Sequence, residues 1–105
     1  MKNHLSAKTD AGLPRSLSAA FQEYDIEQLD PAQHRDLIIE RVLAYGNQSE
    51  ARWLFDIYSA AQIKRWLARL GARRLPWRRY NLWCVLLELP PAQRLRDKEQ
   101  RIWPH

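Results

Sequence analysis

The sequence has 105 residues, of which 46% are apolar and only 3 are glycine, enough for one hydrophobic core and unfavourable for a turn-rich β fold. The net charge of +5 is unevenly distributed: residues 1–60 have 6 Lys/Arg and 9 Asp/Glu, a net charge of −3, whereas residues 61–105 have 11 and 3, a net charge of +8. This asymmetry favours a polyanion or an acidic protein as the partner of the C-terminal half.

The first part of the chain predicts a flexible arm followed by two helices. Residues 1–16 are mostly polar and lack periodicity, so we expect an N-terminal arm that is flexible or loosely docked. Residues 17–24 predict a short helix. Asp30 is a good N-cap and is followed by a proline, the residue that suits the first helical position. Because Gly46 is a stop signal, the second predicted helix spans residues 31–45.

Two short consecutive helices follow, joined by a tight turn. Asn47 or Ser49 can cap the first of them, which runs to about residue 58. Ser59 caps the second, whose apolar residues recur at helical spacing until Gly71 ends it.

The last long helix is predicted to be the central one. Residues 72–75 form a connector, and Pro76 opens a helix that runs to about residue 88. Its apolar residues lie on nearly all sides, which is typical of a helix that others surround. A short helix over residues 92–96 and a polar tail over residues 97–105 complete the chain.

The predicted fold class is therefore all-α: a compact bundle of about five short helices with a flexible N-terminal arm. No segment alternates apolar and polar residues as a strand would. We expect three parts, namely the arm over residues 1–16, a helical domain over residues 17–96 and a C-terminal tail over residues 97–105.

The sequence also predicts a cytoplasmic protein that does not enter a membrane. The single cysteine, Cys84, excludes an internal disulfide and fits a reducing compartment. The N-terminus lacks the continuous apolar stretch of a signal peptide. The longest apolar run, Leu82–Leu87, is far shorter than the roughly 20 residues that span a bilayer.

The candidate binding site is a basic run without acidic residues between Lys64 and Arg79. Its first members are predicted to lie opposite the apolar helix face, and the later ones form a basic corner around the connector. Arg78 and Arg79 oppose the dipole at a helix N-terminus, where stability alone would not place them. Trp77, at the same helix start, is the candidate exposed interface aromatic. The candidate site residues are Lys64, Arg65, Arg69, Arg73, Arg74, Trp77, Arg78 and Arg79.

This basic run fits three interpretations. The first is a non-enzymatic protein-interaction module, and the second is a nucleic-acid-binding regulator that uses the same arginines. The third is a solvated surface whose arginines pair with the acidic N-terminal half. A helix-turn-helix around Gly71 is disfavoured, because the predicted connector is too long and the following helix too apolar. The apolar last helix would allow a homodimer, although nothing in the sequence requires one.

No motif in the sequence points to catalysis, a metal or a cofactor. The three histidines are scattered, and their spacing matches no metal site. Cys84 lies in an apolar run, where an inert buried thiol is expected. Three separated glycines cannot build a phosphate-binding loop. We therefore expect a protein that is not an enzyme and that holds no cofactor.

Residues 20–90 contain a specific combination of polar and apolar positions. The residues that carry this combination are Leu29, Asp30, His34, Ile38, Ile39, Glu40, Arg41, Val42, Leu43, Gly46, Trp53, Leu54, Tyr58, Arg74, Leu75, Asn81, Leu82 and Pro90. The pattern resembles a family of small uncharacterised prokaryotic all-helical proteins, often encoded beside nucleotidyltransferase-type toxins of toxin–antitoxin systems. The resemblance implies an antitoxin-like or accessory role and brings no catalytic residue. The chain departs from the family in its longer N-terminal arm and at residues 76–79.

The polar matching residues include His34, Glu40, Arg41 and Asn81. An apolar core does not need them, so they form either a buried network that fixes the register of the helices or a functional site. We expect Glu40 and Arg41 to pair with Arg74 or with the acidic turn at Asp25.

Overall fold

Two capping boxes set the helix boundaries in the middle of the chain. The structure is a computed structural model that describes residues 7–89. α2, Gln48–Ile57, begins after Asn47, whose side chain accepts a hydrogen bond from the backbone N–H of Glu50. α3, Ala60–Trp66, begins in the same way after Ser59. In each case the third helical residue accepts a hydrogen bond from the cap's own N–H, and the predicted caps at Asn47 and Ser59 are confirmed.

α1, Arg35–Tyr45, begins later than the predicted residue 31. The Asp30 carboxylate accepts a hydrogen bond from the backbone N–H three residues on, at 2.8 Å, as expected of a cap. However, the backbone N–H of Asp30 donates to His34 Nδ1 at 2.9 Å, and residues 31–34 form a turn instead of the first helical turn. The predicted end before Gly46 is correct.

Residues 7–16, assigned to the flexible arm from the sequence, pack on the domain in this structure. Leu13 is fully buried, and Trp53 Nε1 donates a hydrogen bond to the Gly12 carbonyl at 3.1 Å. The sequence did not predict this packing, because the segment is mostly polar and the single buried leucine, Leu13, produces no periodic apolar pattern. Residues 1–6 lie outside the described part of the chain.

A 3₁₀ helix, η2 (Arg15–Phe21), lies in the place of the helix predicted over residues 17–24, and a second one, η3 (Ile26–Gln28), follows it. η2 starts after Pro14 without a side-chain cap, and its first turn has no acidic residue, so the features that favour a regular α-helical start are missing.

Gly71 does not end the helix that begins at Ala60. The continuous helix consists of α3, the π-helical turn η4 (Leu67–Gly71) and α4 (Ala72–Arg74). Gly71 has helical angles, and a Cβ there would lie 2.5 Å from Leu67 Cδ1 and 3.1 Å from Tyr80 Cδ1. A side chain at this position would thus crowd Leu67 of the same helix and the Tyr80 ring of α5, and the glycine does not terminate the helix. The predicted connector over 72–75 is wrong, because only Leu75 and Pro76 separate the helices.

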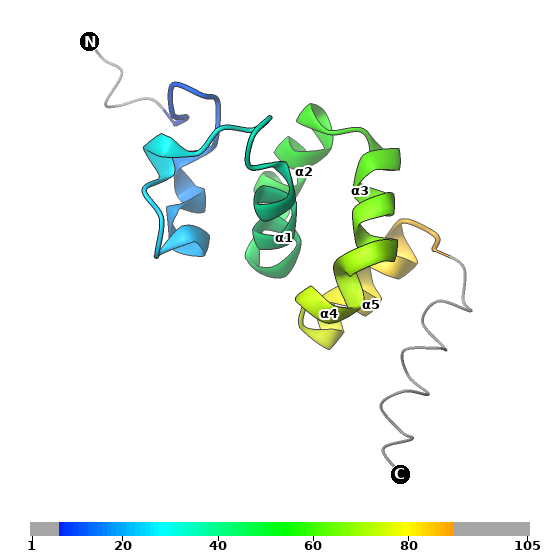
Figure 1. Cartoon of the computed structure of the whole chain (residues 1–105). Helices are drawn as coiled ribbons and strands as arrows, with labels where there is room; N and C mark the ends of the chain where they lie inside the picture. Colours follow the sequence, from blue (N-terminus) through cyan, green and yellow to red (C-terminus); the bar gives the residue numbers. More distant parts are fainter. Residues whose placement is uncertain (1–6, 90–105) are drawn as a thin grey trace.

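α5, Trp77–Leu86, is not the central helix, and it ends before the predicted residue 88. Three of its apolar side chains, Leu82, Val85 and Leu86, are exposed by 46%, 60% and 58%. α1 occupies the centre instead, with contacts to η2, α2, α3 and α5. In Figure 1, η2 and η3 lie on one side of the α1–α2 pair, and α3 to α5 lie on the other.

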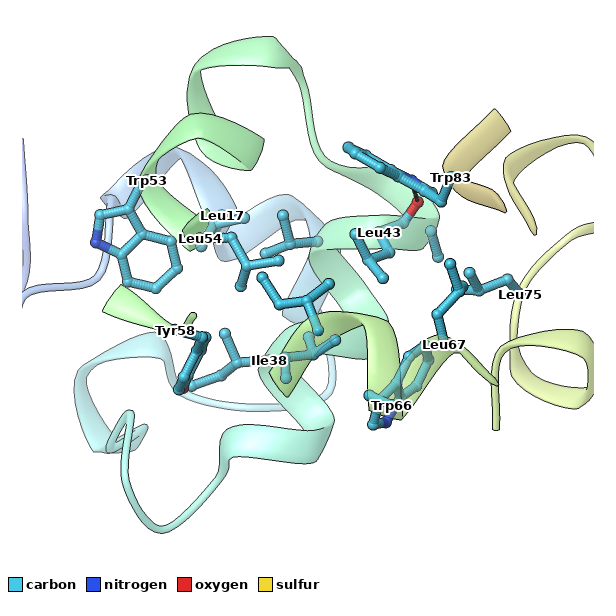
Figure 2. Close-up of a cluster of buried hydrophobic side chains, with 14 of the residues drawn as sticks. Leu17, Ile38, Leu43, Trp53, Leu54, Tyr58, Trp66, Leu67, Leu75 and Trp83 are labelled. Atoms are coloured by element: carbon cyan, nitrogen blue, oxygen red, sulfur yellow. Dashed lines mark hydrogen bonds between the residues drawn. The ribbon is translucent and has the colours of Figure 1, made fainter. Parts of the chain in front are cut away.

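The core follows this arrangement around α1. Figure 2 shows Ile38 and Leu43 of α1 between the side chains of the N-terminal part and α2, such as Leu17 and Leu54, and those of the C-terminal helices, such as Leu67. The predicted all-α class is confirmed for residues 7–89, and no helix among them is long and apolar enough to cross a membrane. The predicted helix over 92–96 and the tail over 97–105 lie outside the described residues.

A buried tyrosine fastens the turn before α1 to the end of α2. Tyr58 is 6% exposed, and its hydroxyl donates a hydrogen bond to the Pro31 carbonyl at 2.6 Å. Burial raises the pKa of Tyr58 to about 12, since desolvation disfavours the phenolate. The hydroxyl therefore remains a donor throughout the neutral range.

Candidate functional site

The helix formed by α3, η4 and α4 presents a row of arginines, here called the arginine ridge. Arg65, Arg69 and Arg73 follow one another at intervals of four residues, which places them along one side of the helix. All three are exposed, and none forms an ion pair with another residue between 7 and 89. Lys64, beside the ridge, is half-buried.

The ridge does not stabilise its own helix. Like charges at i and i+4 destabilise a helix by roughly 0.2–0.5 kcal/mol per pair, and the ridge contains two such pairs, Arg65–Arg69 and Arg69–Arg73. Arg73 in the last turn gains from the helix dipole, but Arg65 and Arg69 lie before that turn. The fold alone does not explain this row.

Arg79 is not part of an available basic surface. Its Nε donates a hydrogen bond to the Leu43 carbonyl at 2.8 Å, and its Nη2 donates to the Gly46 carbonyl at 3.0 Å. Both carbonyls lie at the C-terminal end of α1, where helix carbonyls lack intrahelical partners and a cation is favourable. Arg79 is at the N-terminus of its own helix, yet it stabilises the C-terminus of another. The expectation from the sequence that stability does not explain an arginine at position 79 is therefore wrong.

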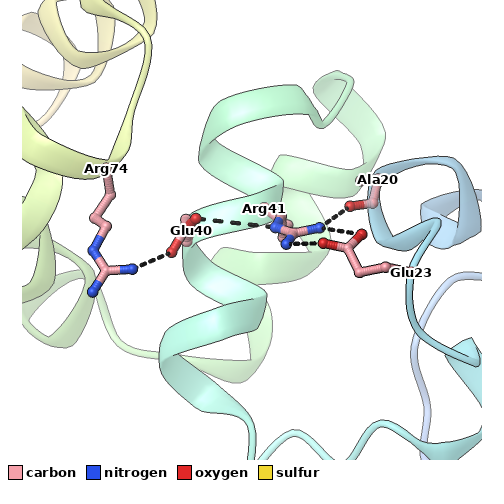
Figure 3. A network of polar contacts seen from close by, with 5 residues as sticks. All are labelled: Ala20, Glu23, Glu40, Arg41 and Arg74. Carbon is pink, nitrogen blue, oxygen red and sulfur yellow. Dashed lines mark hydrogen bonds and ion pairs between the residues drawn. The ribbon is translucent and has the colours of Figure 1, made fainter.

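Arg74 is also engaged, by a network that crosses α1 (Figure 3). Arg74 Nη1 lies 3.6 Å from Glu40 Oε1, as the sequence suggested. The other oxygen of Glu40 lies 4.0 Å from Arg41 Nε. Part of the basic run thus pairs with the acidic N-terminal half, as the third interpretation of the sequence proposed.

Arg41 carries the same network to η2 and the residues after it. It donates a hydrogen bond to the Ala20 carbonyl at 2.8 Å and binds both carboxylate oxygens of Glu23, at 3.1 Å and 2.5 Å. Its guanidinium also lies 5.7 Å from the ring centroids of Phe21 and Tyr24. The hydrogen bonds from Arg41 lower the pKa of Glu23 from 4.5 to about 2. Besides Glu40, the acidic partner of Arg41 is therefore Glu23, rather than the turn at Asp25.

Trp77 is not the exposed interface aromatic that its position suggested. It is half-buried, packs against the core and lies 5.4 Å from the Tyr80 ring, centroid to centroid. The basic corner was predicted to contain Arg73, Arg74, Arg78 and Arg79. Of these four, Arg79 bonds the end of α1 and Arg74 pairs with Glu40. Only Arg73 and Arg78 are exposed and form no ion pair with a residue between 7 and 89.

A helix-turn-helix remains disfavoured, although for only one of the two original reasons. The connector between α4 and α5 is short, so its length does not argue against the motif. The exposed side of α5, however, presents Leu82, Val85 and Leu86, whereas a helix that reads DNA presents polar side chains.

A groove between α1 and α3, which the sequence did not reveal, adjoins the ridge. It measures about 530 Å³. Its lining consists of Arg35, Asp36, Ile39, Gln62, Arg65, Trp66, Ala68 and Arg69. Arg35 is the functional candidate that sequence reasoning missed. It lies 30 residues before Arg65, so no local pattern connects the two.

The described residues show no metal or nucleophile site. Between residues 7 and 89, no group of three His, Cys, Asp or Glu side chains is placed to hold a metal ion. Cys84 is fully buried. His34 is engaged in the turn before α1, where Nδ1 accepts the hydrogen bond from Asp30.

Comparisons with known proteins place part of the chain in a family context. No curated protein and no solved structure matches it. One family model matches, over residues 17–67, which includes the Glu23–Arg41–Glu40 network and Arg65 but neither Arg69 nor α5. This model represents a family of unknown function, DUF6922, so residues 17–67 are similar to an uncharacterised domain.

Proposed function

We propose that the protein is a non-enzymatic interaction module whose arginine ridge binds an acidic protein surface. The observation that supports this proposal is the row of Arg65, Arg69 and Arg73, which is exposed, without acidic neighbours in the run and unfavourable for the helix that carries it. Complementary charge accelerates encounter with a partner and selects against partners of the same sign.

The surroundings of the ridge favour a protein over a nucleic acid. Ile39, Trp66 and Ala68 line the adjoining groove and give it an apolar part. Single-stranded nucleic acids are bound through exposed aromatic rings, whereas Tyr80 is buried and Trp77 is half-buried against the core. A mixed apolar and cationic surface fits a protein partner.

Nucleic-acid binding by the same arginines is the second candidate function. The observation that favours it is the length of the basic run, which has no acidic residue from Lys64 to Arg79. Such binding would weaken steeply with salt because it releases counterions from the phosphates.

The first partner to test is the product of a neighbouring gene. The resemblance described above suggests a nucleotidyltransferase-type toxin and an antitoxin-like role for this chain, and both stay predictions. Co-expression of the two genes followed by co-purification tests the association directly.

Two single charge reversals distinguish binding by the arginine ridge from a general effect of the protein's net charge. Arg69→Glu changes the ridge, whereas Arg52→Glu makes the same change of net charge at an exposed arginine on α2, outside the ridge. We expect Arg69→Glu to weaken binding of the co-purified partner at least tenfold and Arg52→Glu to weaken it less than twofold. Equal affinities of the two variants would refute the proposal.

The same two variants, Arg69→Glu and Arg52→Glu, also show whether the ridge binds a protein or a nucleic acid. Fluorescence anisotropy is measured with labelled polyglutamate and with labelled duplex and single-stranded DNA, at low and at physiological salt. Tight, strongly salt-dependent binding of DNA that only Arg69→Glu abolishes would support the second candidate. Binding of polyglutamate or the partner without DNA binding supports the first.

A further inference from the structure

The groove between α1 and α3 collects cations from two separate helices. Arg35 comes from the first turn of α1, while Arg65 and Arg69 come from the ridge. The only carboxylate in the lining is Asp36, whose Oδ1 lies 3.5 Å from Arg35 Nε. Three guanidinium groups thus face one carboxylate, and the groove has an excess of two positive charges.

One lining residue of the same groove, Trp66, has a buried donor that lacks a partner among the described residues. Trp66 is 2% exposed, and its Nε1 has no hydrogen-bond acceptor among the described residues. The indole nitrogens of Trp53 and Trp83, in contrast, each donate to a backbone carbonyl, at 3.1 Å and 2.9 Å. A buried N–H without an acceptor is costly, and native proteins rarely tolerate one. In Figure 2 Trp66 lies at the border of the core cluster, with its nitrogen away from Leu67.

Part of the groove lining is apolar. Ile39 of α1 and Ala68 of η4 line the groove together with the Trp66 ring. A ligand that fits must therefore bring both acceptor oxygens and an apolar part. A carboxylate beside an aliphatic side chain, as in an acidic peptide with interspersed leucine, combines the two.

We propose that this groove binds a short acidic segment of the partner protein. A carboxylate of the segment lies among Arg35, Arg65 and Arg69, and a neighbouring aliphatic side chain packs on Ile39 and Ala68. An oxygen of the segment accepts the Trp66 indole N–H, which it reaches when a flexible side chain of the groove rotates aside. This inference rests on the proposed function and specifies the chemistry of the partner.

The indole N–H resonances provide a direct test with built-in controls. A ¹⁵N–¹H correlation spectrum of the full chain is recorded while a fluorescein-labelled peptide of alternating glutamate and leucine is added. We expect the Trp66 indole proton, assigned through the Trp66→Phe variant, to move downfield as it acquires an acceptor. The Trp53 and Trp83 indole resonances, whose protons are already bonded, should stay in place.

Matched peptides and variants then measure the contribution of each part. Replacing glutamate with glutamine, or leucine with serine, should weaken peptide binding about tenfold, equivalent to one charge-assisted contact or one buried aliphatic side chain. Trp66→Phe, which keeps a ring and removes the unpartnered donor, should bind the peptide about fivefold more weakly. Arg35→Gln should do the same, whereas Arg52→Gln should have no effect. A cooperative thermal unfolding transition of each variant shows that it has folded, at a lower Tm for Trp66→Phe because that substitution removes buried volume.

The outcomes separate the two proposals. If the Trp66 resonance does not move, or if the serine peptide binds as tightly as the leucine peptide, the groove proposal is wrong while binding by the ridge can stand. If Arg69→Glu and Arg52→Glu bind the partner equally, the proposed function itself falls. Absence of binding by any acidic peptide also overturns the groove proposal.

Discussion

The assignment of Arg79 to the fold rather than to the binding surface can be tested by substitution. Arg78 and Arg79 are adjacent arginines at the start of α5, and sequence alone assigns both to one basic corner. In the structure Arg78 is exposed, whereas Arg79 is half-buried against the end of α1. Arg78→Ala and Arg79→Ala remove the same charge and the same atoms, so each is the control for the other.

The expected loss in Arg79→Ala follows from the carbonyls that lose their donor. A hydrogen bond to a charged group contributes about 1.5–3 kcal/mol. The Leu43 carbonyl retains the hydrogen bond from Trp83 Nε1, at 2.9 Å, whereas the buried Gly46 carbonyl loses its Arg79 donor. Because only one carbonyl is left without its donor, we expect a loss of about 2–3 kcal/mol, in the upper part of the range for one such bond. For a domain of this size that lowers the Tm by roughly 10–20 °C.

Urea denaturation followed by far-ultraviolet circular dichroism measures the difference. Arg78→Ala should remain within about 0.5 kcal/mol of the wild type, as surface substitutions usually do. Arg79→Lys should lie between the wild type and Arg79→Ala, since one ammonium group cannot reproduce the two-pronged contact of a guanidinium. Equal unfolding free energies for Arg78→Ala and Arg79→Ala would refute the assignment of Arg79 to the end of α1.

Three further predictions concern single contacts. Arg69→Glu should stabilise the domain by about 0.5–1 kcal/mol in the same urea assay, because it turns two repulsive pairs on the helix into attractive ones. Glu88→Gly should stabilise it by about 0.5–1 kcal/mol, since Glu88 has a left-handed φ of 57° that costs a residue with a Cβ; unchanged stability would contradict this strain. Because the pKa of Glu23 falls from 4.5 to about 2 on folding, its bond to Arg41 contributes stability above pH 4.5 that is lost as the pH falls to about 2. Glu23→Gln should therefore lose less stability than the wild type between those pH values, and parallel pH profiles would exclude this contribution.

The sequence predicted best what short-range chemistry decides. The caps at Asn47 and Ser59 each depend on a side chain three residues later, so both partners are visible in a short window. The end of α1 before Gly46 was predicted correctly, but the stop signal assumed for a glycine is only part of the reason. Gly46 has an extended conformation rather than a left-handed one, and a Cβ there would lie 2.6 Å from the Val42 carbonyl oxygen.

The errors arise where a distant element determines the role of a residue. A glycine is a common helix stop signal, but Gly71 lies inside a continuous helix, where a Cβ would crowd Leu67 and also the Tyr80 ring of the distant helix α5. The apolar residues of α5 suggested a central position, yet Leu82, Val85 and Leu86 remain exposed. Periodicity shows which residues are apolar and does not show how many neighbouring helices cover them.

The basic run shows the same division for function. Its residues look alike in the sequence, but in the structure Arg79 bonds carbonyls at the end of α1 and Arg74 pairs with Glu40. Arg65, Arg69 and Arg73 remain as a row that repels itself. A residue kept for the fold should lower stability when it is replaced, whereas one kept for contact can raise it. A variant such as Arg69→Glu that unfolds at higher urea concentration and binds its partner more weakly would therefore separate the two roles in one protein, because its loss of binding could not be due to unfolding.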